Sequence, residues 1–240
     1  MGRKRSVPGV VVSVEHASCR VPRRLDHLGL PPAWLRTHRG WDPGAGLVGR
    51  LLARALGAPL HLGRWSRLVA DLNRSVFHPD VVPRHAGTRR VPANHGLTRQ
   101  ERGERLARYW QPYRDAVEAD LDRALQAHGR VLHISIHSFV ERLAGSERRH
   151  QLGLLYNPTR RLERAMAGRL DRRLCAVGYR VRRNSPYSGL EDGFCMRMRA
   201  ERGASSYLGM EIEMNQRWVR QDAGAQRFAA DLVAAFRAES

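Results

Sequence analysis

Apolar residues recur along this chain in two patterns, short runs and helical spacing. Short runs, several with apolar and polar residues alternating, predict buried strands at 10–14, 60–62, 68–72, 132–139, 152–156 and 207–214, and extended chain at 179–182. Spacing of three or four residues predicts helices at 45–57, 97–128, 160–177 and 224–239. Because strands alternate with helices, we expect an α/β fold with a mixed, mostly parallel sheet flanked by helices. No repeat or linker divides the chain, so a single domain over residues 1–240 is expected.

Local signals refine this outline. Thr98 followed by Glu101 resembles a capping box at a helix start, and Pro112 should break or kink the same helical region. Residues 184–189 carry turn chemistry. Residues 78–96 are rich in Pro, His and Arg and predict an excursion over the surface, which is a candidate lid over a site because long loops are often functional.

The composition is strongly basic. Arg and Lys number 42 against 23 Asp and Glu, for a net charge of +19, and 42% of the residues are hydrophobic. Such a charge raises the question of nucleic acid. The arginines are spread along the whole chain, however, without a basic tail, zinc-finger spacing or aromatic–basic pattern. We therefore interpret most of them as solvated, with a field that attracts anionic substrates, and do not expect a nucleic-acid partner.

The cysteines and the N-terminus bear on the compartment. Cys19, Cys175 and Cys195 fit neither a metal-binding pair nor a disulfide framework, which suits a reducing cytoplasm. The apolar run at 7–14 is interrupted by Pro8 and Gly9 and is too short to span a membrane. We expect a cytoplasmic protein without a membrane partner; no feature of the sequence predicts its oligomeric state.

Polar residues collect where the predicted strands end. They are Glu15-His16, Trp41-Asp42, Asp71-Leu72-Asn73-Arg74, His137-Ser138 and Glu211-Ile212-Glu213. Ligands and catalytic groups gather at strand ends in open α/β sheets. Histidines with carboxylates and a separate Glu are the parts of a hydrolytic zinc site, in which three protein ligands leave the fourth position to water. For a lone His137 the plain alternative is a buried histidine satisfied by a hydrogen bond.

The chain resembles the N-formylglutamate amidohydrolase family. The segments that carry the resemblance, from about residue 10 to 220, are Val14-Glu15-His16-Ala17-Ser18, residues 38–45, residues 66–74, Ile134-Ser135-Ile136-His137-Ser138-Phe139, residues 153–156, residues 184–188 and residues 211–216. The resemblance implies a fold similar to that of zinc carboxypeptidases. It also implies a zinc-dependent hydrolase that cleaves the amide of a small anionic N-acyl amino acid or peptide, such as N-formylglutamate.

The same resemblance implies the metal ligands. His16, Asp42 and His137 would hold one Zn²⁺ per chain. Carboxypeptidase-like sites carry a Glu three residues after the first His, where this chain has Cys19. Asp42 is therefore the choice for the carboxylate ligand and Glu15 the reserve. Taken locally, Asp42 just before Pro43 also suits a helix N-cap.

Substrate-binding roles follow from the resemblance as well. Asn73 and Arg74 would anchor the substrate's carboxylate, since the planar guanidinium binds carboxylates through two parallel hydrogen bonds. Arg67 would bind substrate or polarise the scissile carbonyl, and Asp71 would orient one of these arginines. Tyr187 would hydrogen-bond the substrate or the tetrahedral intermediate, with a packed loop aromatic as the alternative.

The resemblance also implies Glu213, just before Met214-Asn215-Gln216, as the general base. Glu213 would take a proton from metal-bound water, and the resulting hydroxide would attack the carbonyl. Glu211 shares its strand face and remains the alternative base, and one of the two glutamates is equally suited to supporting an Arg or His. Two other interpretations stay open: a catalytically inactive binding protein of the same fold, and a basic nucleic-acid-binding protein. A serine hydrolase is disfavoured because the sequence has no G-x-S-x-G motif.

Overall fold

A six-stranded sheet forms the centre of the protein in this computed structural model, which describes residues 9–143 and 145–237. In spatial order the strands are β2 (Leu60–Leu62), β1 (Gly9–Val14), β5 (Val131–Phe139), β10 (Tyr207–Asn215), β8 (Leu152–Leu155) and β9 (Val181–Arg183). The first four are parallel, whereas β8 is antiparallel to β10 and pairs in parallel with β9. The predicted α/β class with a mixed, mostly parallel sheet is confirmed.

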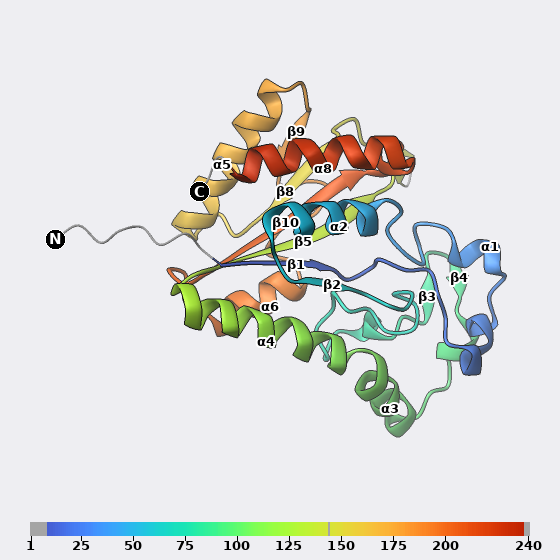
Figure 1. Cartoon of the computed structure of the whole chain (residues 1–240). Helices are drawn as coiled ribbons and strands as arrows, with labels where there is room; N and C mark the ends of the chain where they lie inside the picture. The colour runs from blue at the N-terminus through green and yellow to red at the C-terminus, as the bar shows by residue number, and fades with distance from the viewer. Residues whose placement is uncertain (1–8, 144, 238–240) are drawn as a thin grey trace.

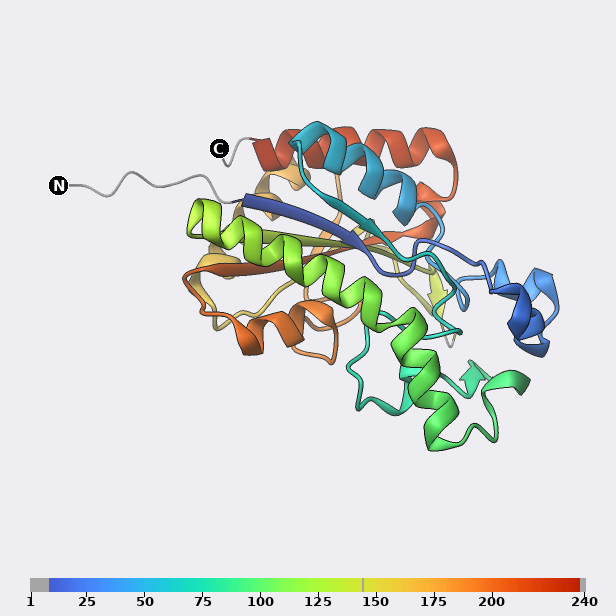
Figure 2. The same cartoon turned by 60° about the horizontal axis from the view of Figure 1, so that its bottom comes forward.

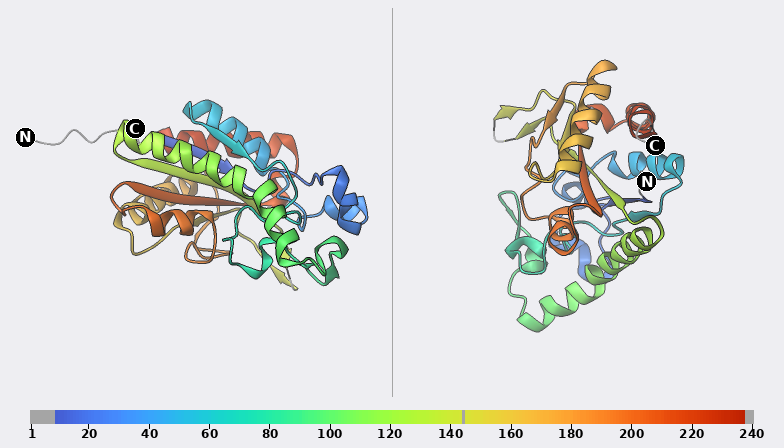
Figure 3. Two further views of the ribbon diagram at one scale, coloured as in Figure 1. Left: turned by 90° about the horizontal axis from the view of Figure 1, so that it is seen from below. Right: turned by 90° about the vertical axis from the view of Figure 1, so that its left-hand side faces the viewer.

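Helices cover both faces of this sheet (Figures 1 and 2). On one face lie α2 (Ala45–Leu56), α5 (Arg161–Ala176) and α8 (Asp222–Arg237), which share the main hydrophobic core with the sheet. The other face carries α4 (Gln111–His128) and α6 (Phe194–Glu201), as the end-on view in Figure 3 also shows. Of these five helices, only α6 was not predicted from the sequence.

The smaller elements mostly lie at the end of the sheet where the parallel strands terminate (Figure 1). They are η1 (Arg23–Gly29), α1 (Pro32–Leu35), η2 (Pro79–Val81), β3 (His85–Ala86), β4 (Arg89–Arg90), η3 (Pro92–Asn94), α3 (Arg99–Tyr109), β6 (Arg142–Leu143), β7 (Ser146–Glu147) and α7 (Gln216–Val219). The capping box of Thr98 and Glu101 is present at the start of α3. The helical region 97–128 breaks at Trp110, so that Pro112 lies in the first turn of α4. No helix in the described ranges is both long and apolar enough to cross a membrane.

The strand predicted at 68–72 is wrong, because this segment is turn and irregular chain. Its backbone groups are satisfied locally: Ser66 Oγ accepts from the Leu68 N–H at 3.2 Å, and the Leu68 carbonyl accepts from Asn94 Nδ2 at 2.8 Å. Its apolar side chains enter two small clusters beside the main core. Burial in those clusters explains the apolar run without any strand pairing.

Alternation along the central strands separates apolar from polar residues. On β5, Leu132, Ile134 and Ile136 enter the main core under α2 and α8. His133, Ser135 and His137 alternate with them and therefore face α4 and α6. Parallel pairing continues the same alternation onto β1 and β10, with Ser135 opposite Ser13 and opposite Glu211. A buried polar layer thus forms on one face of the sheet and leads to its carboxyl end.

Candidate active site

Two histidines and one aspartate converge at the carboxyl ends of β1 and β5. His16 follows β1, His137 lies near the end of β5, and Asp42 lies in the loop before α2. One potential ligand atom from each lies within 4.8 Å of the others, and all three residues are buried. His137 Nδ1 is 3.0 Å and His16 Nδ1 is 3.4 Å from the same Asp42 Oδ2. The structure therefore brings together the three residues predicted as metal ligands.

A second carboxylate lies behind each histidine. His16 Nε2 is 2.7 Å from Asp71 Oδ1, and His137 Nε2 is 3.1 Å from Glu15 Oε2. Both imidazoles are thus held with Nε2 on a carboxylate and Nδ1 toward Asp42. Metal-binding histidines commonly make such a carboxylate contact through the other ring nitrogen, because it fixes ring orientation and tautomer. Asp71 therefore contacts a histidine, where the sequence led us to expect that it orients an arginine.

Glu15 is fully buried and firmly held. Ser135 Oγ donates to its Oε2 at 2.6 Å, and the Tyr113 hydroxyl donates to its Oε1 at 3.3 Å. Burial alone would raise the pKa of the Glu15 carboxyl, but the hydrogen bond and charge of His137 lower it well below its usual value. Burial likewise disfavours a charged His137, yet its contacts with Asp42 and Glu15 raise the pKa of the imidazole. Glu15 is thus placed to support His137, and it lies outside the cluster that would hold a metal.

Glu213 on β10 lies directly opposite His137 on the neighbouring strand β5. The two residues are register partners of β10 and β5, so their side chains emerge side by side on one face. Glu213 Oε2 is buried and has no hydrogen-bond partner among the described residues. Burial raises the pKa of this carboxyl to about 8. A carboxyl with this pKa and a free oxygen directed into a site is suited to proton transfer near neutral pH.

Glu211, the alternative base, has a different environment. Its Oε1 lies 3.8 Å from Arg199 Nη1, although Glu211 lines the same cavity as His137 and Glu213. Arg199 is itself bound to Glu163 through Nε at 3.0 Å, and both of these residues are buried. Glu211 therefore belongs in part to a buried ion-pair group that ties α5 and α6 to the sheet.

The predicted substrate-binding residues surround the same cavity, which has a volume of about 170 Å³. Arg67 Nη2 donates to Asp42 Oδ1 at 2.5 Å and also contacts His16 Nδ1. Arg74 lines the cavity while its Nη1 donates to the Asp192 carbonyl at 2.9 Å. The Asn73 Oδ1 accepts from the Phe194 N–H at 2.8 Å, so this side chain caps the start of α6 as well as lining the cavity.

Tyr187 lies at the rim and is 38% exposed. The guanidinium of Arg148 stands over its ring, 5.2 Å from the centroid, and can donate to its hydroxyl at 3.4 Å. Glu191 and Asp192 complete this rim; the sequence analysis did not single them out. Their position after the 184–189 turn was the available signal, since a turn joined to a strand-end cavity tends to place polar residues at its mouth.

The excursion at 78–96 does not form part of the described wall of this cavity. None of its residues lines the cavity; instead Ala86 and Val91 pack with Leu28 and Leu35 in a separate apolar cluster. The segment named as a candidate lid thus lies outside this cavity, and its apolar residues pack against η1 and α1. Cys19 also lies outside the active-site cavity and lines a different one.

A parallel-stranded α/β sheet that gathers histidines, carboxylates and arginines at its strand ends is typical of hydrolytic enzymes. A family model described as N-formylglutamate amidohydrolase matches residues 9–219. The chain therefore belongs to the N-formylglutamate amidohydrolase family, and the resemblance noted in the sequence is confirmed.

Two solved structures share the fold of this chain. A gene product from Agrobacterium tumefaciens is 30% identical, with a TM-score of 0.85 over 96% of this chain and 89% of that one. N-formylglutamate amidohydrolase from Ralstonia eutropha JMP134 shares the fold at 21% identity, with a TM-score of 0.78 over 96% of this chain and 92% of that one. A comparison with curated protein sequences found no match.

Proposed function

We propose that this protein is a zinc-dependent hydrolase that cleaves the amide bond of an N-acyl amino acid such as N-formylglutamate. The observation that carries the proposal is the buried His16–Asp42–His137 cluster beside Glu213. Family membership supports an amidohydrolase. The metal and the roles of individual residues are our inference from the geometry, and the substrate is our inference from the family.

The donor set suits zinc. Two imidazole nitrogens and one carboxylate oxygen are the ligand types that catalytic zinc sites use, with a position left for water. The Nδ1 atoms of His16 and His137 and the Asp42 carboxylate would hold the ion. Arg67 would have to shift as it binds, because its guanidinium contacts the lone pair of His16 Nδ1. When bound, zinc would lower the pKa of water toward about 7 and polarise the scissile carbonyl.

Residues of the protein itself would transfer the proton, stabilise the oxyanion and bind the substrate. Glu213 accepts the proton of the attacking water through its free Oε2 and returns it to the leaving amine. Arg67, released from His16, donates to the oxyanion that develops on the carbonyl. Arg74 binds the substrate's carboxylate with the donors that Asp192 does not use, and Tyr187 closes the rim over the substrate. Binding at these points fixes which carbonyl meets the nucleophile.

The test is metal content together with turnover of the purified wild-type protein. We expect about one zinc ion per chain and hydrolysis of N-formylglutamate that stops on chelation and returns with zinc. A panel of other N-formyl and N-acetyl amino acids would define the preferred side chain and acyl group. A protein that binds no zinc even after reconstitution, and hydrolyses none of the panel, would instead support the alternative of an inactive binding protein.

The carboxylate behind His137 gives a separate prediction about metal affinity. Replacing Glu15 with Gln keeps the side-chain volume but removes the charge that orients the imidazole, and we expect zinc affinity to fall about 10–100-fold. Competition with a chromophoric chelator measures this directly. Glu147→Gln, an exposed change on β7, is the matched control and should leave affinity unchanged. Equal affinities for Glu15→Gln and wild type, in variants that melt at similar temperatures, would show that Glu15 has no role in metal binding.

Four further expectations from the sequence stay predictions: a single domain over residues 1–240, the likeness to zinc carboxypeptidases, the cytoplasmic location and the absence of a nucleic-acid partner.

A further inference from the structure

Ser135, in the middle of β5, lies between Glu15 and His137 in the buried polar layer. Its Oγ is 2.6 Å from Glu15 Oε2 and 2.9 Å from His137 Nε2, and these two atoms are 3.1 Å from each other. Glu15, Ser135 and His137 are 0%, 1% and 2% exposed, so solvent does not compete for these contacts. The three side chains therefore form a closed, buried triangle, and no step of the proposed hydrolysis involves Ser135.

The directions of these hydrogen bonds determine which nitrogen of His137 carries hydrogen. A serine hydroxyl has one hydrogen, and Ser135 donates it to Glu15 Oε2. Toward His137 the Ser135 oxygen can then only accept, and the Glu15 carboxylate also accepts. Two acceptors therefore hold the hydrogen on Nε2 and leave Nδ1 as the nitrogen for a metal.

Asp42 acts on the opposite edge of the same ring. Its Oδ2 lies 3.0 Å from His137 Nδ1, so this carboxylate attracts a hydrogen to the nitrogen that a metal would use. A metal-bound imidazole keeps only one hydrogen, and the carboxylates of Asp42 and Glu15 would draw it to opposite sides. Ser135 adds a second acceptor on the Nε2 side, which favours the arrangement that binds metal.

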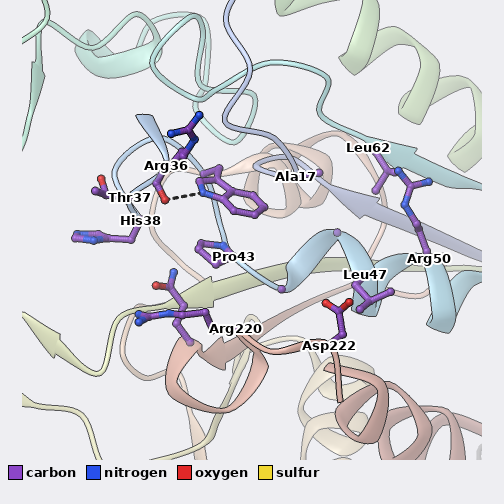
Figure 4. Close-up of a pocket in the computed structure, with 14 residues that line it drawn as sticks. Ala17, Arg36, Thr37, His38, Pro43, Leu47, Arg50, Leu62, Arg220 and Asp222 are labelled. Carbon is purple, nitrogen blue, oxygen red and sulfur yellow. Dashed lines mark hydrogen bonds between the residues drawn. The ribbon is translucent and has the colours of Figure 1, made fainter. Parts of the chain in front are cut away.

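The two edges of the ring also differ in how closely they are enclosed. Asp42 lines the active-site cavity, and the next residue, Pro43, lines another cavity of about 710 Å³ beside α2 (Figure 4). Ser135 and Glu15 line neither of these cavities, and Tyr113 on α4 donates to Glu15 Oε1 at 3.3 Å from the outer side. The orientation of the ring is therefore held from its closed, Nε2 edge.

We propose that Ser135 is a positioning residue of the metal site. Its hydroxyl fixes the Glu15 carboxylate and accepts from His137 Nε2, and both contacts keep Nδ1 directed toward His16 and Asp42. The consequence for zinc rests on the proposed function, whereas the orientation of the imidazole is a property of the metal-free protein as well.

Ser135→Ala tests this role with two measurements. Competition with a chromophoric chelator should show zinc affinity about tenfold lower than wild type, the usual effect of losing a partner behind a histidine ligand. In metal-free, isotope-labelled protein, the Nε2–H resonance of His137 is identified by its loss in His137→Ala. We expect this hydrogen to exchange with water faster in Ser135→Ala, because one of its two acceptors is gone. Tyr113→Phe should change both quantities in the same direction but less, and it keeps the test available if Ser135→Ala does not fold.

Tyr207→Phe is the matched control for Tyr113→Phe. It removes another hydroxyl from the same polar layer, but this one bonds to His133 Nδ1 at 2.8 Å, so zinc affinity and exchange at His137 should stay at wild-type values. The proposal is overturned if the folded Ser135 and Tyr113 variants keep both wild-type values, or if Tyr207→Phe changes them equally. A wild-type protein that binds no zinc would contradict the proposed function. The exchange rate alone then decides whether Ser135 orients His137: faster exchange in Ser135→Ala supports the role, and an unchanged rate overturns it.

Discussion

Replacing Glu213 with Gln should lower kcat by about 10²–10⁴-fold, the contribution expected of a general base. The amide keeps the size of the carboxyl but cannot accept the proton of the attacking water. Because Glu213 is not among the clustered metal-ligand candidates, zinc content should stay at the wild-type level. Steady-state kinetics with the preferred substrate and metal analysis of the same preparation measure both quantities.

Glu211→Gln is the informative comparison. Glu211 shares the strand face but lies near Arg199, within a buried ion-pair group. The Glu211→Gln change should mainly lower the melting temperature, because it weakens a contact of the buried Arg199. A Glu213→Gln enzyme that turns over at nearly the wild-type rate, or a Glu211→Gln enzyme with the larger loss of kcat at equal stability, would show that the base is assigned to the wrong glutamate.

The sheet and the clustered histidines could be predicted because their signals are local. Residues 132–139 alternate apolar with polar side chains, and the polar residues His137 and Ser138 come just before the strand ends. The same period placed Glu211 and Glu213 on one face. Strand ends of a parallel sheet share one edge, so His16 and His137, which lie far apart in the chain, were expected near each other.

What the sequence could not predict depends on partners distant in the chain. Helix α6 begins at Phe194 and is preceded by Gly193, which has no side chain to cap it. The acceptor for the Phe194 N–H is the side chain of Asn73, 121 residues earlier. The sequence therefore could not predict that Asn73 caps α6. Likewise, Asp71 lies in irregular chain, and its contact with His16, 55 residues earlier, depends on tertiary structure that the local pattern does not contain.

Replacing His137 with Ala should abolish zinc binding and, with it, hydrolysis. The imidazole is buried between Asp42 and Glu15, so its removal takes away one ligand atom. It also removes the contact that lowers the pKa of Glu15, whereas Arg67 and His16 still lower the pKa of Asp42. Two ligands are too few for a stable catalytic zinc site. Metal analysis after dialysis against zinc, beside wild type, is the direct measurement.

The fold must be checked in the same experiment, because a buried pair that loses one partner is also destabilised, by about 3–5 kcal/mol. His133→Ala is a suitable control: this buried histidine lies on the same strand face but contacts Ser13 and Tyr207 instead of the cluster. It should lose stability while retaining zinc. If His137→Ala melts no earlier than His133→Ala and still binds about one zinc ion per chain, the metal lies elsewhere and the His16–Asp42–His137 assignment fails.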